Sequence, residues 1–265
     1  MGSSAATMEA FENVLILLGI MMPRIMGALI IAPFFGANSP AGMPRRVFMI
    51  ASILILVPML FPTMPTHPLP ALFICALIAK EILIGVLFGF ASGVGFWAMQ
   101  AAGEYIDLQR GATAGAFFNP FLGGMSSPMG DFMLRLSIML FFSAGGFTIF
   151  FSGLLVSFQI YSPWELLPAL KVSKAVPLLR VAGQIFLMSL LYAAPLLILF
   201  LLIDLGLGFM SRFVPSLNVF FFSFPIKSVV GTFFLIIYLS FLAWAFLRNL
   251  FTGDTLLFWV RSILS

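Results

Sequence analysis

Few side chains in this sequence could do chemistry, and several of them interrupt apolar runs. Lys80 and Glu81 are adjacent within the run 71–102, and Asp204 interrupts the run 181–210. An ionisable group at membrane depth is a candidate functional group, because burying an unpaired charge is costly. Such groups could relay protons. Adjacent residues point to different sides of a helix, so Lys80 and Glu81 should be poor partners of one another. We expect each to pair with a neighbouring helix or subunit.

A second charged group follows the same apolar run. Glu104, Asp107 and Arg110 are spaced three residues apart, which places them on one face of a helix end. We expect buried charge partners at five positions: Lys80, Glu81, Glu104, Asp107 and Arg110. The isolated charges Asp204 and Lys227 are interpreted as structural partners rather than substrate ligands.

The chain has few of the side chains that enzymes use for catalysis or metal binding. There is one cysteine, Cys75, inside an apolar run, and one histidine, His67, in a proline-rich segment. A His/Cys metal cluster or a Ser-His-Asp triad needs more such side chains than these. We therefore predict no catalytic residue, no metal site and no cofactor.

The stretch 103–131 lies between two long apolar runs and contains charges, glycines and an Asn-Pro step. Irregular chain at membrane depth is tolerated only where it is buried in protein or lines a watery cavity. Pro120 pushes Asn119 out of helical geometry, and paired glycines permit unusual backbone angles. A bulky apolar tip on a bendable base suits a plug, because hydrophobic constrictions can gate by dewetting. The predicted plug or gate residues are Gly111, Gly115, Phe117, Phe118, Asn119, Pro120 and Phe121. An ordinary re-entrant packing loop is the alternative.

The composition indicates an integral membrane protein. The chain has 265 residues, of which 62% are hydrophobic and 8% charged, whereas soluble domains carry about 25% charged residues. The net charge of +4 comes from scattered lysines and arginines. Nucleic acid is not an expected partner, because no basic patch or stripe is visible.

The sequence contains six apolar runs whose length is close to that of a bilayer crossing. The expected spans are 13–33, 47–61, 71–102, 132–158, 181–210 and 228–247. Prolines 58, 62, 65, 68 and 70 should end the second run in a short extended loop. Strict alternation of the spans places Lys171, Lys174 and Arg180 outside, against the positive-inside rule. Either the central stretch changes parity, or some helices pack against partner subunits rather than lipid.

Three glycines recur every four residues in the third run, at Gly85, Gly89 and Gly93. Such a face lets another helix approach closely. We expect helix packing there, either within the chain or against another subunit.

Several motifs together resemble the FliR/SctT family, the export-gate subunit of flagellar and virulence type III secretion systems. The matching pieces are APFFG followed by MPRR, GEYIDLQRGA with FNP downstream, SSPMGD before an apolar run, and PSLNVFFFSFPIK. The resemblance covers about residues 13–250 and is greater to the injectisome branch, SctT, than to the flagellar one.

The resemblance implies a subunit present in one copy that joins SctR and SctS subunits in a helical export gate. It also implies the switch protein SctU and rod or needle components as neighbours, with unfolded secreted proteins passing through. In that family the apparatus is raised toward the periplasm, which would explain the failed charge alternation. The family's plug loop corresponds to residues 111–122 here, with Phe117, Phe118 and Asn119 at the constriction.

We therefore predict an all-α, multi-pass protein of the bacterial inner membrane, built from about six helices arranged as helical hairpins around a central plug loop. A single membrane domain should occupy 1–265, with an N-terminal tail at 1–12, the plug region at 103–131 and an amphipathic C-terminal tail at 248–265. The predicted function is a non-enzymatic export gate. The alternative is a secondary transporter of a small solute or ion, with Lys80, Glu81 and Asp204 as relay groups. Such transporters often contain an inverted repeat, and none is evident between the two halves of this sequence.

Overall fold

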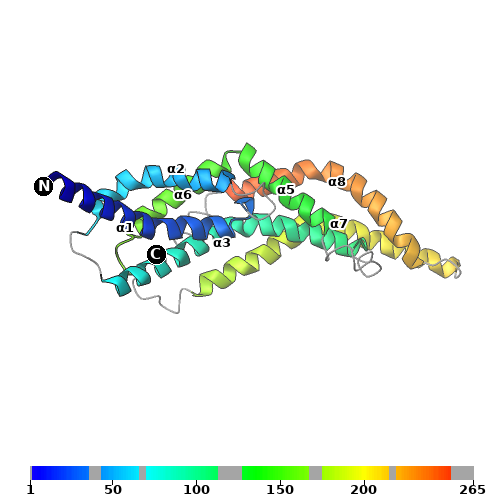
Figure 1. Cartoon of the computed structure of the whole chain (residues 1–265). Coiled ribbons are helices and arrows are strands. Elements are labelled where there is room, and N and C mark those ends of the chain that lie inside the picture. The colour runs from blue at the N-terminus through cyan, green and yellow to red at the C-terminus, as the bar shows by residue number, and fades with distance from the viewer. Residues whose placement is uncertain are drawn as a thin grey trace, which may run out of the picture. The chain divides into compact units, whose positions relative to one another are not determined.

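Every regular element that can be described is a helix. The computed structural model describes residues 2–35, 43–65, 70–112, 127–166, 175–214 and 219–251. The helices in these ranges are α1 (Gly2–Ile31), α2 (Met43–Leu60), α3 (Ala71–Gln109), α5 (Pro128–Ser143), α6 (Gly146–Ile160), α7 (Ala175–Phe213) and α8 (Val219–Phe251), with short 3₁₀ turns at η1 (Pro33–Phe35) and η2 (Phe61–Thr63) (Figure 1). The predicted all-α class is confirmed.

Five of these helices are individually long and apolar enough to cross a membrane, and α5 with α6 can supply a sixth crossing as a bent pair. The expected number of spans is confirmed on that count. The fourth span is not continuous, however. Gly145 takes a left-handed φ of 76° and its N–H donates to the carbonyl of Phe142 at 3.2 Å. This is the usual way in which a glycine ends a helix, and the apolar character of 132–158 concealed it.

Helix ends also differ from the sequence expectation elsewhere: α1 begins at Gly2 rather than near residue 13, and α7 begins at Ala175 rather than near residue 181. α2 continues through Pro58, which was expected to end it, and Pro62 lies in the turn η2. α3 continues to Gln109, and α8 begins at Val219 rather than near residue 228, with Pro225 inside it. A proline close to a helix end removes only one hydrogen bond, so the helix can continue past it.

The described helices divide into two compact units. The first contains α1, α2, the start of α3 and α6. The second contains the rest of α3, α5, nearly all of α7, and α8. α3 contributes to both units, with residues 71–93 in the first and 94–109 in the second.

Glycines determine how α1 meets α3 in the first unit. A Cβ placed on Gly85 would overlap the carbonyl oxygen of Arg24, and one on Gly89 would lie 2.5 Å from the carbonyl oxygen of Ala28. From the other side, a Cβ on Gly27 would lie 2.9 Å from the carbonyl oxygen of Ile82. The two helices thus approach backbone to backbone, which only residues without side chains permit.

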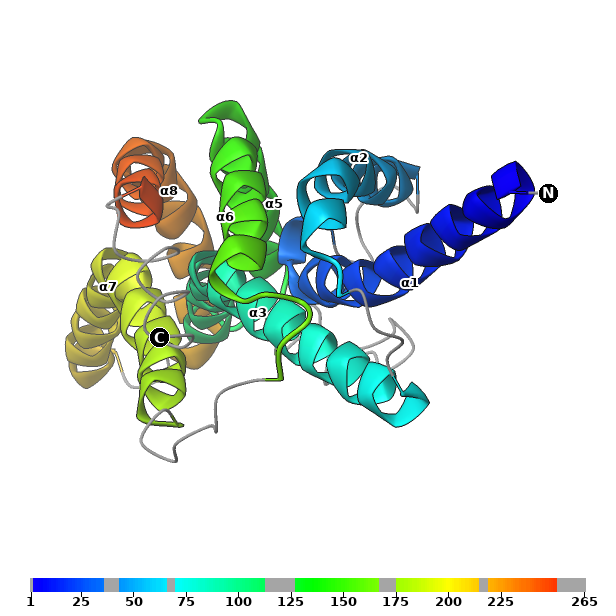
Figure 2. The ribbon, with the colours of Figure 1, turned by 90° about the vertical axis from the view of Figure 1, so that its left-hand side faces the viewer.

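The remainder of the first unit is packed with aromatic rings. Phe150 of α6 meets Phe34 edge-on at 4.9 Å between ring centroids and lies 5.2 Å from Phe88 of α3. α2 lies alongside α1 (Figure 2), and its Phe48 meets Phe147 at 5.2 Å. Edge-to-face rings at these separations pack well and hold the helices in register.

The core of the second unit is built in the same way. Phe96 of α3 meets Phe141 of α5 at 5.3 Å and Phe246 of α8 at 5.7 Å, both in T-shaped geometry. All three side chains are almost fully buried. α7 joins this core where the ring of Phe200 occupies the space beside Gly231 of α8. This packing fixes the helices that carry the polar groups described next.

Candidate functional site

A buried charge cluster joins α1 and α3 in the first unit. Arg24 of α1 donates to both carboxylate oxygens of Glu81, from Nε to Oε2 at 2.5 Å and from Nη2 to Oε1 at 2.8 Å. Lys80 Nζ lies 2.9 Å from the same Oε1. Arg24 and Glu81 are fully buried, and Lys80 is only 6% exposed. A two-pronged pair of this kind is both strong and geometrically specific.

The expectation that Lys80 and Glu81 would be poor partners is wrong. Adjacent Cβ atoms do diverge on a helix, but the four-carbon lysine stem is long enough for its ammonium group to return to the neighbouring carboxylate. The expectation that Glu81 pairs with another helix is correct, and its partner is Arg24. Sequence reasoning missed that role, although Arg24 is the only charged residue within the apolar window 14–31.

The remaining Arg24 donors reach the end of α6. Nη1 donates to the carbonyl of Ser157 at 2.8 Å and to its hydroxyl oxygen at 3.3 Å, and Nη2 donates to the carbonyl of Tyr161 at 3.1 Å. The guanidinium carbon also lies 4.1 Å from the centroid of the Phe158 ring, a cation–π distance.

The side chain of Tyr161, whose carbonyl accepts from Arg24, is itself partly buried. This burial raises the pKa of the Tyr161 phenol above its usual range.

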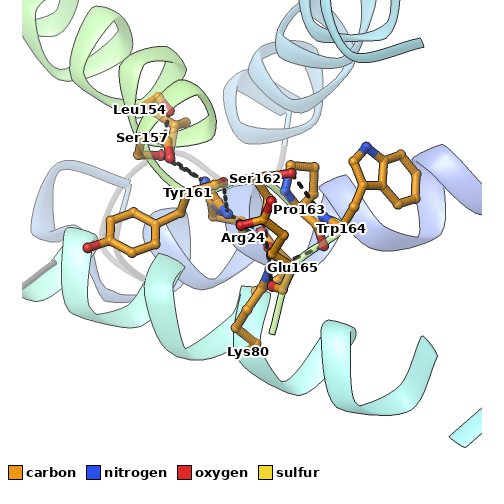
Figure 3. A network of polar contacts seen from close by, with 10 residues as sticks. Arg24, Lys80, Leu154, Ser157, Tyr161, Ser162, Pro163, Trp164 and Glu165 are labelled. Atoms are coloured by element: carbon orange, nitrogen blue, oxygen red, sulfur yellow. Dashed lines mark hydrogen bonds and ion pairs between the residues drawn. The ribbon is translucent and has the colours of Figure 1, made fainter. Parts of the chain in front are cut away.

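Lys80 continues the same pattern beyond the end of α6. Its ammonium donates to the carbonyls of Ser162 at 3.0 Å, Pro163 at 3.1 Å and Glu165 at 2.7 Å (Figure 3). These three carbonyls belong to the chain that follows α6, so the ammonium holds that chain against α3. Since all Arg24 and Lys80 donors have acceptors, the cluster fixes α1, α3 and the end of α6 in place.

A second polar cluster lies in the second unit, at the two sides of residues 113–126. α3 ends with Gly111 in the left-handed region, at a φ of 76°. The N–H of Gly111 donates to the carbonyl of Leu108 at 3.2 Å, and the N–H of Ala112 donates to that of Asp107 at 3.0 Å. These two bonds make a Schellman motif, which closes a helix at a defined residue.

The carboxylate of Asp107 connects this end of α3 to the start of α5. Its Oδ2 accepts from the hydroxyl of Ser127 at 2.6 Å and from the N–H of Met129 at 2.8 Å. Ser127 is the N-cap of α5, because its hydroxyl oxygen accepts from the N–H of Gly130 at 2.9 Å. One buried carboxylate therefore holds together the chain that enters segment 113–126 and the chain that leaves it.

The other residues predicted to act in this region differ in their burial and contacts. Arg110 is half-buried, and its Nη2 lies 2.6 Å from Oδ1 of Asp107, an ion pair rather than a well-aligned hydrogen bond. Glu104 is exposed rather than buried within this chain, and its Cγ lies beside Gly130 of α5, so a partner on another subunit stays a prediction. Gly93 is buried. The predicted plug residues Gly115, Phe117, Phe118, Asn119, Pro120 and Phe121 lie outside the described residues.

A fourth ion pair supports the same region from α7 and α8. Lys227 Nζ lies 2.6 Å from Oδ2 of Asp204, and the other carboxylate oxygen accepts from the hydroxyl of Ser223 at 2.9 Å. The two isolated charges expected to be structural partners are thus partners of one another. Among the described residues, no group of three or more His, Cys, Asp or Glu side chains is arranged to hold a metal ion.

The helices and their buried ion pairs define a multi-pass helical membrane protein whose polar groups hold helix ends. Residues 15–252 match the family described as bacterial export proteins, family 1. The chain therefore belongs to this family of bacterial export proteins.

Relatives from both secretion and flagellar systems are similar over most of the chain. Yop proteins translocation protein T of Yersinia pestis is 33% identical, over 87% of this chain and 88% of its own. Flagellar biosynthetic protein FliR of Pectobacterium carotovorum is 33% identical, over 78% of each chain. Surface presentation of antigens protein SpaR of Salmonella typhimurium is 29% identical, over 82% of this chain and 80% of its own.

These matches confirm the predicted FliR/SctT family and a function in protein export. They set aside the alternative of a small-solute transporter, since the family is one of export proteins. The apolar helices agree with a multi-pass location in the bacterial inner membrane.

Proposed function

We propose that this chain is a gate subunit of the type III protein secretion export apparatus. In this proposal it assembles with SctR and SctS subunits to form and seal the inner-membrane passage for unfolded secreted proteins. It acts without chemistry of its own and supplies shape, packing and a barrier.

The observation that carries the proposal is the double attachment at Asp107. A loop that closes a passage needs a base that does not drift, and here the carboxylate holds the last turn of α3 against the first turn of α5. The α3–α5 contact is close, since a Cβ on Gly103 would lie 2.5 Å from the carbonyl oxygen of Met129. The segment between these ends contains the apolar sequence Phe117–Phe118–Asn119–Pro120–Phe121, which we assign to the constriction.

The Arg24–Glu81–Lys80 cluster has a supporting role in the proposal. A pore subunit must keep its helices in register while polypeptide passes, and a saturated buried ion cluster specifies register more sharply than apolar packing alone. Lys80 and Glu81 are therefore assigned to the scaffold rather than to ion transport.

The proposal extends to the surroundings of the chain. We assign it to the injectisome branch, with the switch protein SctU and the rod or needle components as neighbours and with the gate raised toward the periplasm. The sequence motifs support the branch.

Deleting residues 111–122 in the assembled apparatus tests the gate. We expect faster passive passage of small ions or a small dye across the membrane, with assembly retained, because the deletion removes the apolar constriction and leaves the helices in place. Dye efflux per assembled complex measures this. Ser143→Ala is the control, since the Ser143 side chain is exposed at the end of α5 and its hydroxyl donates to the carbonyl of Leu140 in the same helix. An unchanged rate of dye efflux in the deletion variant would contradict the proposal that this segment is a gate.

A further inference from the structure

The last turn of α3 receives a cation from α8. The ammonium of Lys227 donates to the carbonyl of Gln109 at 3.1 Å. In the Schellman motif described above, Gln109 is in the last helical turn, where carbonyls have no donor within the helix. A cation at this position also complements the negative end of the helix dipole.

Lys227 is held where it can do this. Its side chain is almost fully buried, and Asp204 of α7 neutralises it at 2.6 Å. Asp204 is itself held by Ser223, one turn before Lys227 on α8. The carboxylate is therefore fixed by two residues of α8, and the ammonium is directed at the α3 carbonyl rather than being a loose surface charge.

A second contact from α8 reaches the next residues of the same chain end. The ring of Phe224 occupies the position where a Cβ would stand on Gly111. Phe224 and Lys227 are three residues apart and so lie on one face of α8. This face thus contacts the helix end at Gln109 and the left-handed residue that terminates the helix, which are the last described turns before segment 113–126.

We propose that Lys227 is a positioning residue for the base of segment 113–126, acting through the Gln109 carbonyl. This inference rests on the proposed gate function and adds α8 to it: the position of the α8 face defined by Phe224 and Lys227 sets where segment 113–126 begins. A displacement of that face relative to α3 would release the base of the gate without any change in the segment itself.

A simple α7–α8 ion pair is the alternative reading of Lys227, and two variants separate the readings. Lys227→Met removes the ammonium from both Asp204 and Gln109 while keeping the length of the side chain. The double variant Asp204→Asn/Lys227→Met removes both charges, so that neither partner is left buried and unpaired, and it also removes the donor to Gln109. A positioning role predicts that the double variant leaks as much as Lys227→Met, whereas an ion pair alone predicts that the double variant regains the barrier.

The experiment is efflux of a small dye through the assembled apparatus, divided by the amount of complex measured by native mass spectrometry. We expect Lys227→Met to raise the efflux rate about tenfold, because losing one charge-assisted hydrogen bond shifts a conformational equilibrium by roughly that factor. The double variant Asp204→Asn/Lys227→Met should raise it as much as Lys227→Met does, and Lys227→Arg, which keeps a cation and several donors, should keep the barrier. A restored barrier in the double variant, or a tight barrier in Lys227→Met, would overturn the proposal.

Two further comparisons keep the result clear. If Lys227→Met does not assemble, Lys227→Gln takes its place, and failure of both to assemble would overturn a positioning role. The deletion of 111–122 separates this inference from the gate itself. If the deletion variant leaks dye and Lys227→Met does not, the proposed gate is supported and only the positioning role of Lys227 is contradicted. If the deletion variant does not leak dye, the proposed gate itself is contradicted. Lys227→Met should add nothing to the leak of the deletion variant.

Discussion

At the scale of single residues, the cations matter through the carbonyls they satisfy as much as through their carboxylate partners. Arg24 and Lys80 share one carboxylate, Glu81, and direct their other donors to backbone oxygens at the end of α6. The two cations thus share one anion, and most of their other acceptors are backbone carbonyls at and just beyond the end of α6. Removal of Glu81 would therefore leave two buried cations facing one another with no anion between them.

We expect Glu81→Ala to destabilise the folded chain by about 3–5 kcal/mol, as breaking a buried ion pair on one side does. Thermal unfolding of the purified protein in mild detergent would measure it. Glu165→Gln is the control, because the Glu165 side chain is exposed and only its carbonyl accepts from Lys80. Equal losses in both variants would contradict the assigned role of Glu81.

At the scale of elements, two helices end on a left-handed glycine with the same φ of 76°, Gly111 at α3 and Gly145 at α5. They differ in surroundings. No atom lies within 4 Å of a Cβ on Gly145, whereas the Phe224 ring fills that position at Gly111. The two ends provide a matched pair that separates backbone strain from packing.

Gly145→Ala should cost about 1–2 kcal/mol, the strain of a side chain in the left-handed region. Gly111→Ala should cost clearly more, because the added methyl must also displace Phe224 of α8. Unfolding midpoints in detergent measure both losses. An equal loss would mean that Phe224 yields freely and does not hold the end of α3.

The elements could be predicted from sequence largely because apolar runs of bilayer length are a strong signal. The all-α class, six crossings and the glycine face at Gly85 and Gly89 follow from composition and spacing. The break at Gly145 and the helical course through Pro58 could not, since each depends on one residue's backbone geometry. The pairing of Arg24 with Glu81 joins positions 57 residues apart, and no local pattern indicates which distant charge a buried group will meet.

At the scale of the whole molecule, the chain leaves much apolar surface uncovered. Large hydrophobic side chains such as Leu72, Phe213 and Ile237 are about four-fifths exposed. Surface of this kind must be covered by lipid or by other subunits, and the family's role in export favours a multi-subunit assembly.

Native mass spectrometry of the chain co-expressed with SctR and SctS tests that expectation. We expect a defined hetero-oligomer holding one copy of this chain after extraction in mild detergent, because the exposed helical faces are then covered by partners. A monomer or homodimer without the other subunits would contradict the assigned partners.

The distance along the chain between Arg24 and Glu81 also bears on synthesis. Ribosomes add about 5–20 residues per second, so on the order of 3–11 s separate the appearance of the guanidinium from that of its carboxylate, 57 residues later. During that interval α1 carries an uncompensated cation in its apolar stretch. A central arginine costs about 2.5–3.5 kcal/mol in a membrane helix, and the arrival of Glu81 with α3 offsets that cost.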